Sequence, residues 1–122
     1  MPRAGLTPDR VAELGCQVAD EVGWDSLTLA AVAQRVGVRL PSLYKHVANV
    51  EDLRTRVAVR TVTDLRQEVE RRCHGLSGRA ALGALAHAYR GFARSNPGRY
   101  PAVVRAPGEG QAELAGAATA LL

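Results

Sequence analysis

The sequence predicts an all-α fold. Apolar residues recur at intervals of three and four along most of the 122 residues, and no segment alternates apolar and polar side chains as a half-buried strand would. Proline and glycine occur where the helical pattern starts and stops. Nearly half of the residues are apolar, which is typical of a globular chain rather than a disordered one.

The first two helices have clear start and stop signals. Thr7 can cap the first helix, Pro8 fits its first turn, and Gly23 ends it. Thr28 can cap a second helix of only about eight residues, which ends at Gly37. Glycine adopts the left-handed conformation readily, so Gly37 can reverse the chain there.

A third short helix and a long fourth helix follow. The third is expected over residues 40–47, with Leu43 and Val47 facing the core. Asn49 can cap the fourth helix, whose apolar stripe continues until Gly75. At about 1.5 Å per residue such a helix spans roughly 35 Å, more than a three-helix domain needs. We therefore expect it to project beyond that domain as a connector.

Three further helices are expected downstream. Ser77 can cap the fifth, which ends at residues 96–98, and shorter helices follow at about residues 99–105 and 111–122. One face of the fifth helix is apolar and is formed by Leu82, Leu85, Ala86, Tyr89 and Phe92. The chain is thus expected to form a helix-turn-helix domain over residues 1–48, joined by the connector helix to a helical regulatory domain within residues 49–122.

The charged residues are distributed unevenly. No acidic residue occurs from Ser26 to Val50, whereas Arg35, Arg39 and Lys45 lie in that window. A phosphate-facing surface needs such a window, because a carboxylate there would repel the DNA backbone. Eleven arginines against three acidic residues over positions 54–105 most often indicate a solvated helix face.

The sequence argues against an enzyme, a metal site and a membrane span. It has no glycine-rich phosphate loop and no nucleophile with an evident partner. Cys16 and Cys73 lack partners at zinc spacing, so we interpret both as ordinary buried thiols without a metal or cofactor. No apolar run reaches the roughly 18 residues of a spanning helix, and no signal peptide is recognisable, so we expect a soluble, cytoplasmic protein.

Two short helices joined by a tight glycine turn are typical of a helix-turn-helix, whose second helix enters the DNA major groove. Lys45 can reach a guanine edge or a phosphate, and Ser42 and Tyr44 can donate to phosphate oxygens. Thr28 offers a hydroxyl to another phosphate. The outward positions of the third helix are Leu40, Pro41, Ser42, Tyr44, Lys45 and His46. The alternative is an ordinary polar surface, with Tyr44 at the rim of the core and His46 as a helix cap.

The segments LTLAAVAQRVGV (27–38), PSLYKHV (41–47) and NVEDL (49–53) resemble the N-terminal domain of the TetR family of transcriptional regulators. The resemblance implies that Thr28 and Tyr44 contact backbone phosphate. It also implies contacts to bases or phosphates from Arg39, Leu40, Pro41, Ser42, Lys45 and His46.

This chain departs from the family pattern at three positions. Arg39 replaces the usual small capping residue, Leu40 stands where a polar residue is common, and Val50 replaces a frequent lysine that contacts phosphate. These departures predict a DNA preference that differs from that of relatives, and one fewer phosphate contact.

Residues 89–100 are similar to a helix and turn in the regulatory domain of one TetR subgroup. The resemblance implies that a small effector, apolar or aromatic, binds among these helices and releases the DNA. The candidate pocket residues are Leu65, Val69, Leu85, Tyr89, Phe92, Tyr100 and Val103. Plain core is the alternative for that set. The helices that normally form the family's dimer interface are not recognisable before Leu122, so we expect that the chain is truncated or dimerises through other helices.

The sequence therefore predicts a homodimeric, ligand-responsive repressor of palindromic operator DNA, with each recognition helix in one of two major grooves about a helical turn apart. The rival interpretation is a helical interaction module that has lost DNA binding. Leu40 and Val50 are the residues that favour it.

Overall fold

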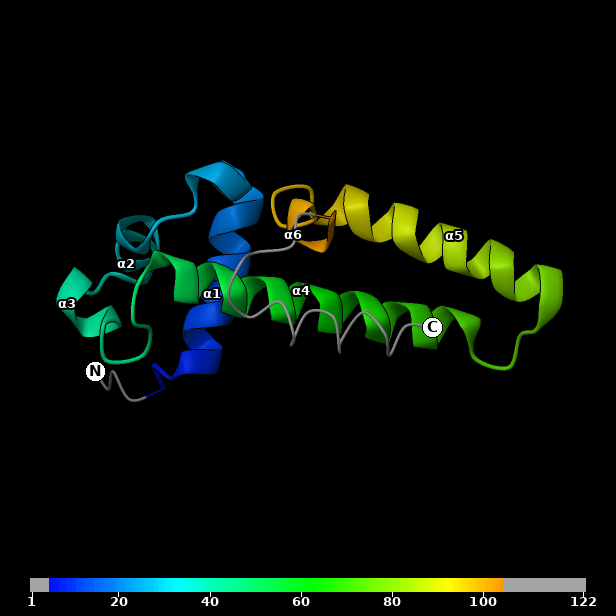
Figure 1. Cartoon of the computed structure of the whole chain (residues 1–122), viewed down its shortest axis with the longest axis horizontal. Helices are drawn as coiled ribbons and strands as arrows, with labels where there is room; N and C mark the ends of the chain where they lie inside the picture. The colour runs from blue at the N-terminus through cyan, green and yellow to red at the C-terminus, as the bar shows by residue number, and fades with distance from the viewer. Residues whose placement is uncertain (1–4, 105–122) are drawn as a thin grey trace.

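The computed structural model describes residues 5–104, and every regular element in that range is a helix (Figure 1). The elements are α1 (Pro8–Val22), the 3₁₀ turn η1 (Trp24–Ser26), α2 (Leu29–Val36), α3 (Leu40–Leu43), α4 (Val50–Cys73), α5 (Gly78–Ser95) and α6 (Pro101–Val104). The all-α prediction is therefore confirmed for these residues. The helix expected over residues 111–122 lies outside them. None of the described helices is long and apolar enough to cross a membrane.

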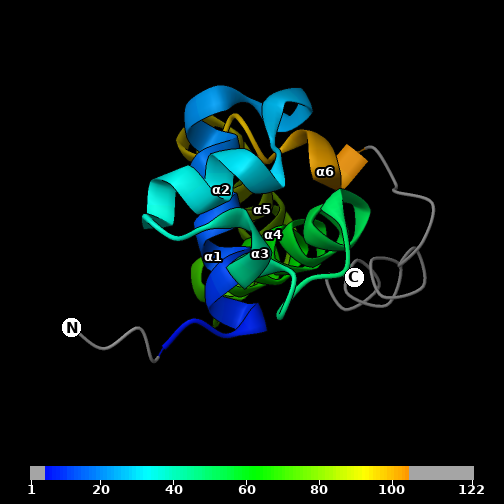
Figure 2. The ribbon, with the colours of Figure 1, turned by 90° about the vertical axis from the view of Figure 1, so that its left-hand side faces the viewer.

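Helices α1, α2 and α3 cluster at one end of the molecule, and α4 leads away from them along its length (Figure 1). α5 turns back along α4, and α6 brings the chain to the side of α4 near α1. Seen from the α3 end, α2 and α3 lie in front of α1 (Figure 2). The long fourth helix thus connects the two parts of the fold, as its length predicted.

The first helices begin and end where their local signals lie. Thr7 Oγ1 accepts a hydrogen bond from the Arg10 backbone N–H at 3.1 Å, and Thr28 Oγ1 accepts one from Ala31 at 3.1 Å. Gly37 ends α2 with φ of 81°, a left-handed conformation that favours glycine. Behind these caps lies one apolar core, built mainly from Val11, Leu14, Val18, Leu27, Val32, Leu43, Val47, Leu53 and Val57.

The third helix is shorter than predicted. Its regular part is Leu40–Leu43, and residues 44–46 continue as turns rather than as helix. Arg39, its N-cap, makes no side-chain capping bond, and the Tyr44 backbone N–H donates to the Pro41 carbonyl three residues back at 3.2 Å. A segment with a weak cap and such tight turns does not continue as regular α-helix. Even so, Leu43 and Val47 are both buried, as expected.

A reciprocal cap joins the α3 segment, residues 40–47, to α4. Asn49 Oδ1 accepts from the Asp52 backbone N–H at 2.8 Å, and Asp52 Oδ2 accepts from the Ala48 N–H at 2.9 Å. This is the logic of a capping box, in which each side chain satisfies a backbone donor at the helix start. The Arg56 guanidinium also holds Asp52, with Nε 3.2 Å from Oδ1. The chain direction between α3 and α4 is therefore fixed by side chains as well as by packing.

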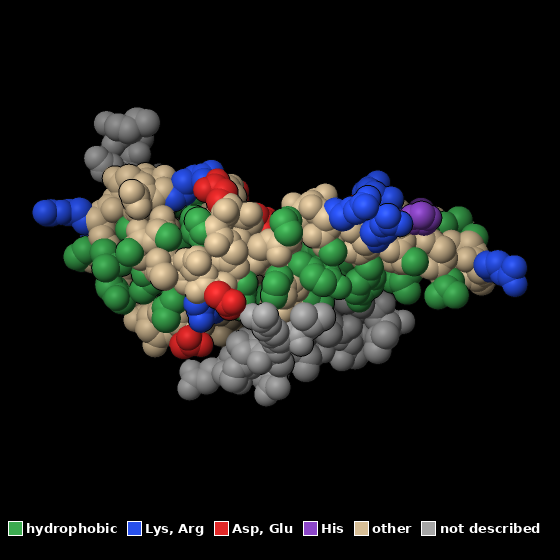
Figure 3. Space-filling view, turned by 90° about the horizontal axis from the view of Figure 1, so that it is seen from above, with side chains coloured by type: hydrophobic (Ala, Val, Ile, Leu, Met, Phe, Trp, Pro, Cys, Tyr) green, Lys and Arg blue, Asp and Glu red, His purple; other side chains and the backbone are tan. Residues whose placement is uncertain are grey.

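Ser77 is the N-cap residue of α5, as expected, but its side chain makes no capping bond. The apolar face of α5 is covered only in part. Phe92 is buried and Leu85 is half-buried, but Leu82 is 66% exposed. Among the described residues, α5 packs mainly on α4. A single neighbouring helix covers only one side of α5, so part of its apolar face stays exposed. Apolar side chains accordingly show on the surface of this half of the molecule, beside a group of basic ones (Figure 3).

Candidate nucleic-acid interface

In the α3 segment, residues 40–47, buried and exposed side chains are clearly separated. Leu43 and Val47 are buried, whereas Tyr44 is 53% exposed and Lys45 is exposed. The other predicted contact residues on this surface are Leu40 and Pro41, which are exposed, and Ser42 and His46, which are half-buried. The structure thus brings the six outward positions together on one short segment.

Thr28 lies at the exposed start of α2, where the polypeptide has just left η1. Its hydroxyl oxygen accepts the capping bond from Ala31, but its O–H proton is free to donate in another direction. Arg54 braces this segment from α4, with Nη2 3.3 Å from the Leu27 carbonyl oxygen. Thr28 therefore sits on a supported backbone with a hydroxyl that can serve a phosphate oxygen.

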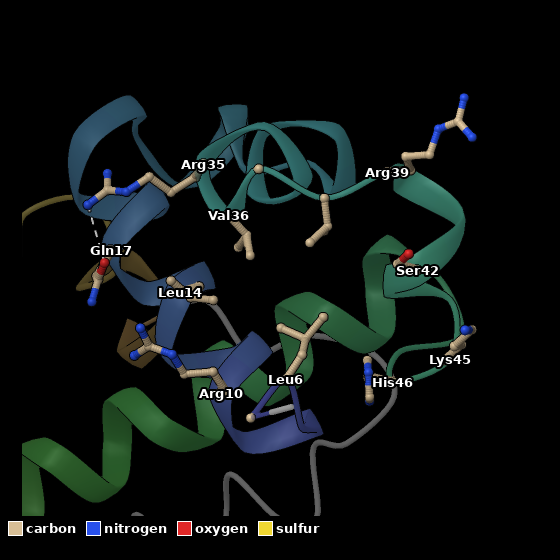
Figure 4. Close-up of a pocket in the computed structure, with 13 residues that line it drawn as sticks. Leu6, Arg10, Leu14, Gln17, Arg35, Val36, Arg39, Ser42, Lys45 and His46 are labelled. Carbon is tan, nitrogen blue, oxygen red and sulfur yellow. Dashed lines mark hydrogen bonds between the residues drawn. The ribbon is translucent and has the colours of Figure 1, made fainter. Parts of the chain in front are cut away.

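A wide groove of about 1040 Å³ lies between the start of α1, the end of α2 and the α3 segment (Figure 4). We call it the basic groove, and its lining residues are Gly5, Leu6, Arg10, Leu14, Gln17, Arg35, Val36, Gly37, Val38, Arg39, Ser42, Lys45 and His46. None of these lining residues is an aspartate or a glutamate. The acid-free window of the sequence thus supplies the α2 and α3 side of this groove, while Glu13 and Glu21 pair with its lining residues Arg10 and Arg35 from outside the window.

The basic side chains of the groove are not equivalent. Arg35 donates to Glu21 and, at 3.3 Å, to Gln17 Oε1, so it ties α2 to α1. Arg39, Lys45 and His46 lie at the α3 end of the groove, and the Arg39 side chain extends away from the other groove residues (Figure 4). The sequence alone could not show that Arg35 is held by an ion pair whereas Arg39 extends freely, because Glu21, the partner of Arg35, lies fourteen residues earlier in the chain.

The departure at residue 50 has a local explanation. Val50 is half-buried and packs against the N-terminal core at the start of α4. An apolar residue at this position gains from that contact. Arg39 and Leu40, the other two departures, are both exposed at the entry to α3.

A polar junction between the two ends of the fold was not foreseeable from the sequence. Arg99 Nη1 donates to Asp64 Oδ2 on α4 at 2.9 Å, and the Arg99 backbone N–H donates to Asp20 Oδ1 on α1 at 3.2 Å. Arg99 Nη2 donates to Asn96 Oδ1 at 2.9 Å, and the guanidinium carbon lies 5.3 Å from the centroid of the Phe92 ring. We call Asp20, Asp64, Asn96 and Arg99 the Arg99 junction.

The turn that carries Arg99 presses directly on α1. A Cβ atom added to Gly98 would overlap the backbone oxygen of Ala19, which leaves no room for any side chain. Burial raises the pKa of Asp20 above its usual range, although Arg99 opposes that shift. Burial likewise raises the pKa of the nearby Cys16 thiol, again against the opposing effect of Arg99. The junction is therefore a closely packed and partly desolvated contact.

The seven candidate pocket residues lie together in one apolar cluster between α4, α5 and the segment that leads into α6. Leu65, Val69 and Phe92 are buried in it, and the half-buried members are Leu85, Tyr89, Tyr100 and Val103. The structure thus brings the predicted set together, and its members pack against one another as a core does.

One family profile and two curated relatives are similar to parts of this chain. A family profile described as the "Tetracyclin repressor-like, C-terminal domain" matches residues 82–122. An uncharacterized HTH-type transcriptional regulator of Mycobacterium tuberculosis is 39% identical over 104 residues, which is 85% of this chain and 48% of that relative. A second, of Bacillus subtilis, is 37% identical over 103 residues, which is 84% of this chain and 54% of that relative.

The chain spans about half the length of these curated relatives. The matched residues include the helix-turn-helix region, and the profile match begins within α5. Together with the buried and exposed pattern around α3, these matches assign the fold. Residues 82–122 are thus similar to the tetracyclin repressor-like C-terminal domain, and most of the chain is similar to HTH-type transcriptional regulators.

Proposed function

We propose that this chain is a DNA-binding transcriptional regulator whose residues 1–48 read an operator. The observation that carries the proposal is the surface of the α3 segment. Tyr44 and Lys45 are exposed there, whereas Leu43 and Val47 are buried in the core. The basic groove, whose lining residues include no aspartate or glutamate, lies beside this surface. Such a surface suits a polyanion, because phosphates dominate affinity for DNA. The names of the two relatives support the same role.

Positioning and sequence reading fall to different residues in this proposal. Thr28 and Tyr44 donate to backbone phosphates and fix the position of the DNA-binding domain along the duplex. Lys45 reads a guanine edge, and exposed Leu40 contacts a thymine methyl. The remaining proposed contacts to bases or phosphates come from Arg39, Pro41, Ser42 and His46.

The proposal extends to repression that a small molecule relieves. Residues 49–122 then form the regulatory part, with an apolar or aromatic effector binding at the cluster that contains Phe92 and Tyr89. Half-buried Leu85 and Tyr89 support this placement, because a ligand can reach them with little rearrangement. Two such chains would bind a palindromic operator as a homodimer.

DNA binding is tested by fluorescence anisotropy on the intergenic DNA upstream of the gene and on a random duplex, each over a range of salt. Lys45→Ala should weaken binding to the upstream DNA by about 1 to 3 kcal/mol and change random binding much less. Tyr44→Phe should weaken both duplexes nearly alike, since phosphates are common to all sequences.

The result that contradicts the proposal is equally specific. A wild-type chain with no salt-dependent affinity for either duplex, together with no effect of the two substitutions, would favour a helical interaction module instead.

A further inference from the structure

We propose that the basic groove carries a DNA strand beyond α3, and that Arg10 on α1 is an additional phosphate contact. This inference rests on the proposed function and names a contact outside the helix-turn-helix. Arg10 lines the same groove as Lys45 and His46, which belong to the proposed reading surface. The groove is therefore continuous with that surface rather than a separate hollow (Figure 4).

The charge of the groove identifies its occupant as an anion. Its lining residues include Arg10, Arg39 and Lys45 and no carboxylate, so the groove attracts an anionic chain, although Glu13 lies beside Arg10. The walls between the basic side chains are apolar and include Leu6, Leu14 and Val36. A sugar–phosphate backbone suits such a surface, because its phosphates need cations and its deoxyribose rings have C–H faces.

Arg10 is freer for this contact than Arg35, which makes one more side-chain hydrogen bond. The Arg10 side chain is 47% exposed, and its ion pair is with Glu13 on the same helix face at 2.7 Å. An exposed pair of this kind contributes little and is screened by salt, so a phosphate can displace the carboxylate. Arg35, by contrast, is held by both Glu21 and Gln17 and forms part of the wall.

The chain offers a closely matched control. Arg71 is also exposed and also pairs with a glutamate three residues away on its own helix, with Nη2 2.7 Å from Glu68 Oε1. It lies in the last turn of α4, at the end far from α3 (Figure 1). Arg10→Gln and Arg71→Gln therefore each remove one positive charge from an exposed pair with a glutamate three residues away, at opposite ends of the molecule; Glu68 keeps Arg72 as a second partner.

The test is the salt dependence of binding to a random duplex, measured by anisotropy with the full chain. Loss of one phosphate contact should reduce the slope of log Kobs against log salt by about 0.9. We expect that reduction for Arg10→Gln and an unchanged slope for Arg71→Gln. Arg10→Lys should keep the wild-type slope, because it keeps the charge, which separates a lost contact from a misfolded variant.

The outcomes are distinguishable from those that test the proposed function. If the wild type binds DNA with a clear salt slope and Arg10→Gln has the same slope, the groove inference is overturned while DNA binding stands. The groove inference is also overturned if Arg10→Gln and Arg71→Gln lower the slope equally, since the effect would then be that of net charge. If the wild type does not bind DNA, the proposed function fails and the groove inference falls with it.

Discussion

Arg99 and Asp64 meet at 2.9 Å although thirty-five residues separate them, and their contact ties the turn after α5 to the middle of α4. Asp20 of α1 joins the same guanidinium, with Oδ2 3.5 Å from Arg99 Nε. The helix-turn-helix end and the α5–α6 end of the fold therefore share one polar contact. A change in the packing of α5 and α6 has a direct physical route to α1 through it.

Replacing Arg99 should destabilise the protein. Its side chain is only 11% exposed, and Arg99→Ala would leave Asp20 and Asp64 partly buried without that cation. We expect a loss of about 2 to 3 kcal/mol in the free energy of unfolding, measured by urea denaturation. Arg94→Ala, at an exposed position near the end of α5, should change it by less than about 0.5 kcal/mol. Equal losses in the free energy of unfolding for the two variants would show that the Arg99 junction does not stabilise the fold more than an exposed arginine does.

Gly98 should tolerate no larger residue. In Gly98→Ala the new Cβ would overlap the Ala19 backbone oxygen, and backbone atoms cannot move aside as a flexible side chain can. We expect a loss of about 3 kcal/mol or more in the free energy of unfolding, by the same measurement.

The matched substitution for Gly98→Ala is Gly83→Ala, within α5. A Cβ there meets no atom within 4 Å, so the change should stabilise the helix by about 0.5 to 1 kcal/mol. Opposite signs for the two glycines are expected. A harmless Gly98→Ala would mean that the turn does not press on α1.

Cys16 should make the protein sensitive to alkaline pH. Burial raises the folded pKa of the Cys16 thiol above its ordinary value of 9.0, so the unfolded chain loses this proton at a lower pH than the folded one. The stability that this difference contributes is fully present well below pH 9 and is lost as pH rises through 9 toward the folded pKa. Stability should therefore fall as pH rises from about 8 to about 10. Urea denaturation under reducing conditions should show a smaller fall for Cys16→Ala than for Cys73→Ala, which retains Cys16. Identical pH profiles for the two variants would contradict the burial of an un-ionised Cys16 thiol.

The helices that depend on local signals could be predicted from the sequence. Thr7, Thr28 and Asn49 each make the capping bond that their position indicated, and Gly37 adopts the left-handed turn. Which side chains of the α3 segment face outward also followed from the spacing of Leu43 and Val47. Local signals sufficed because each of these features involves residues that are close in the chain.

Features that depend on distant contacts could not be predicted in this way. Residues 96–98 looked only like the end of a helix, whereas Gly98 proves to be a close contact with α1. The partial exposure of α5 was missed because an apolar stripe does not reveal how many neighbours cover it. The role of each groove arginine was equally hidden, since Arg35 finds its partner Glu21 on another helix.

The most direct test of the central claim, that the α3 segment reads the major groove, is methylation interference on the bound upstream DNA. Guanine N7 lies in the major groove, so a methyl group there blocks a side chain that approaches that edge. We predict that N7 methylation at a few guanines abolishes binding of the wild type, and that Lys45→Ala becomes insensitive to methylation at one of them. Binding that no N7 methylation weakens at any guanine would contradict the claim.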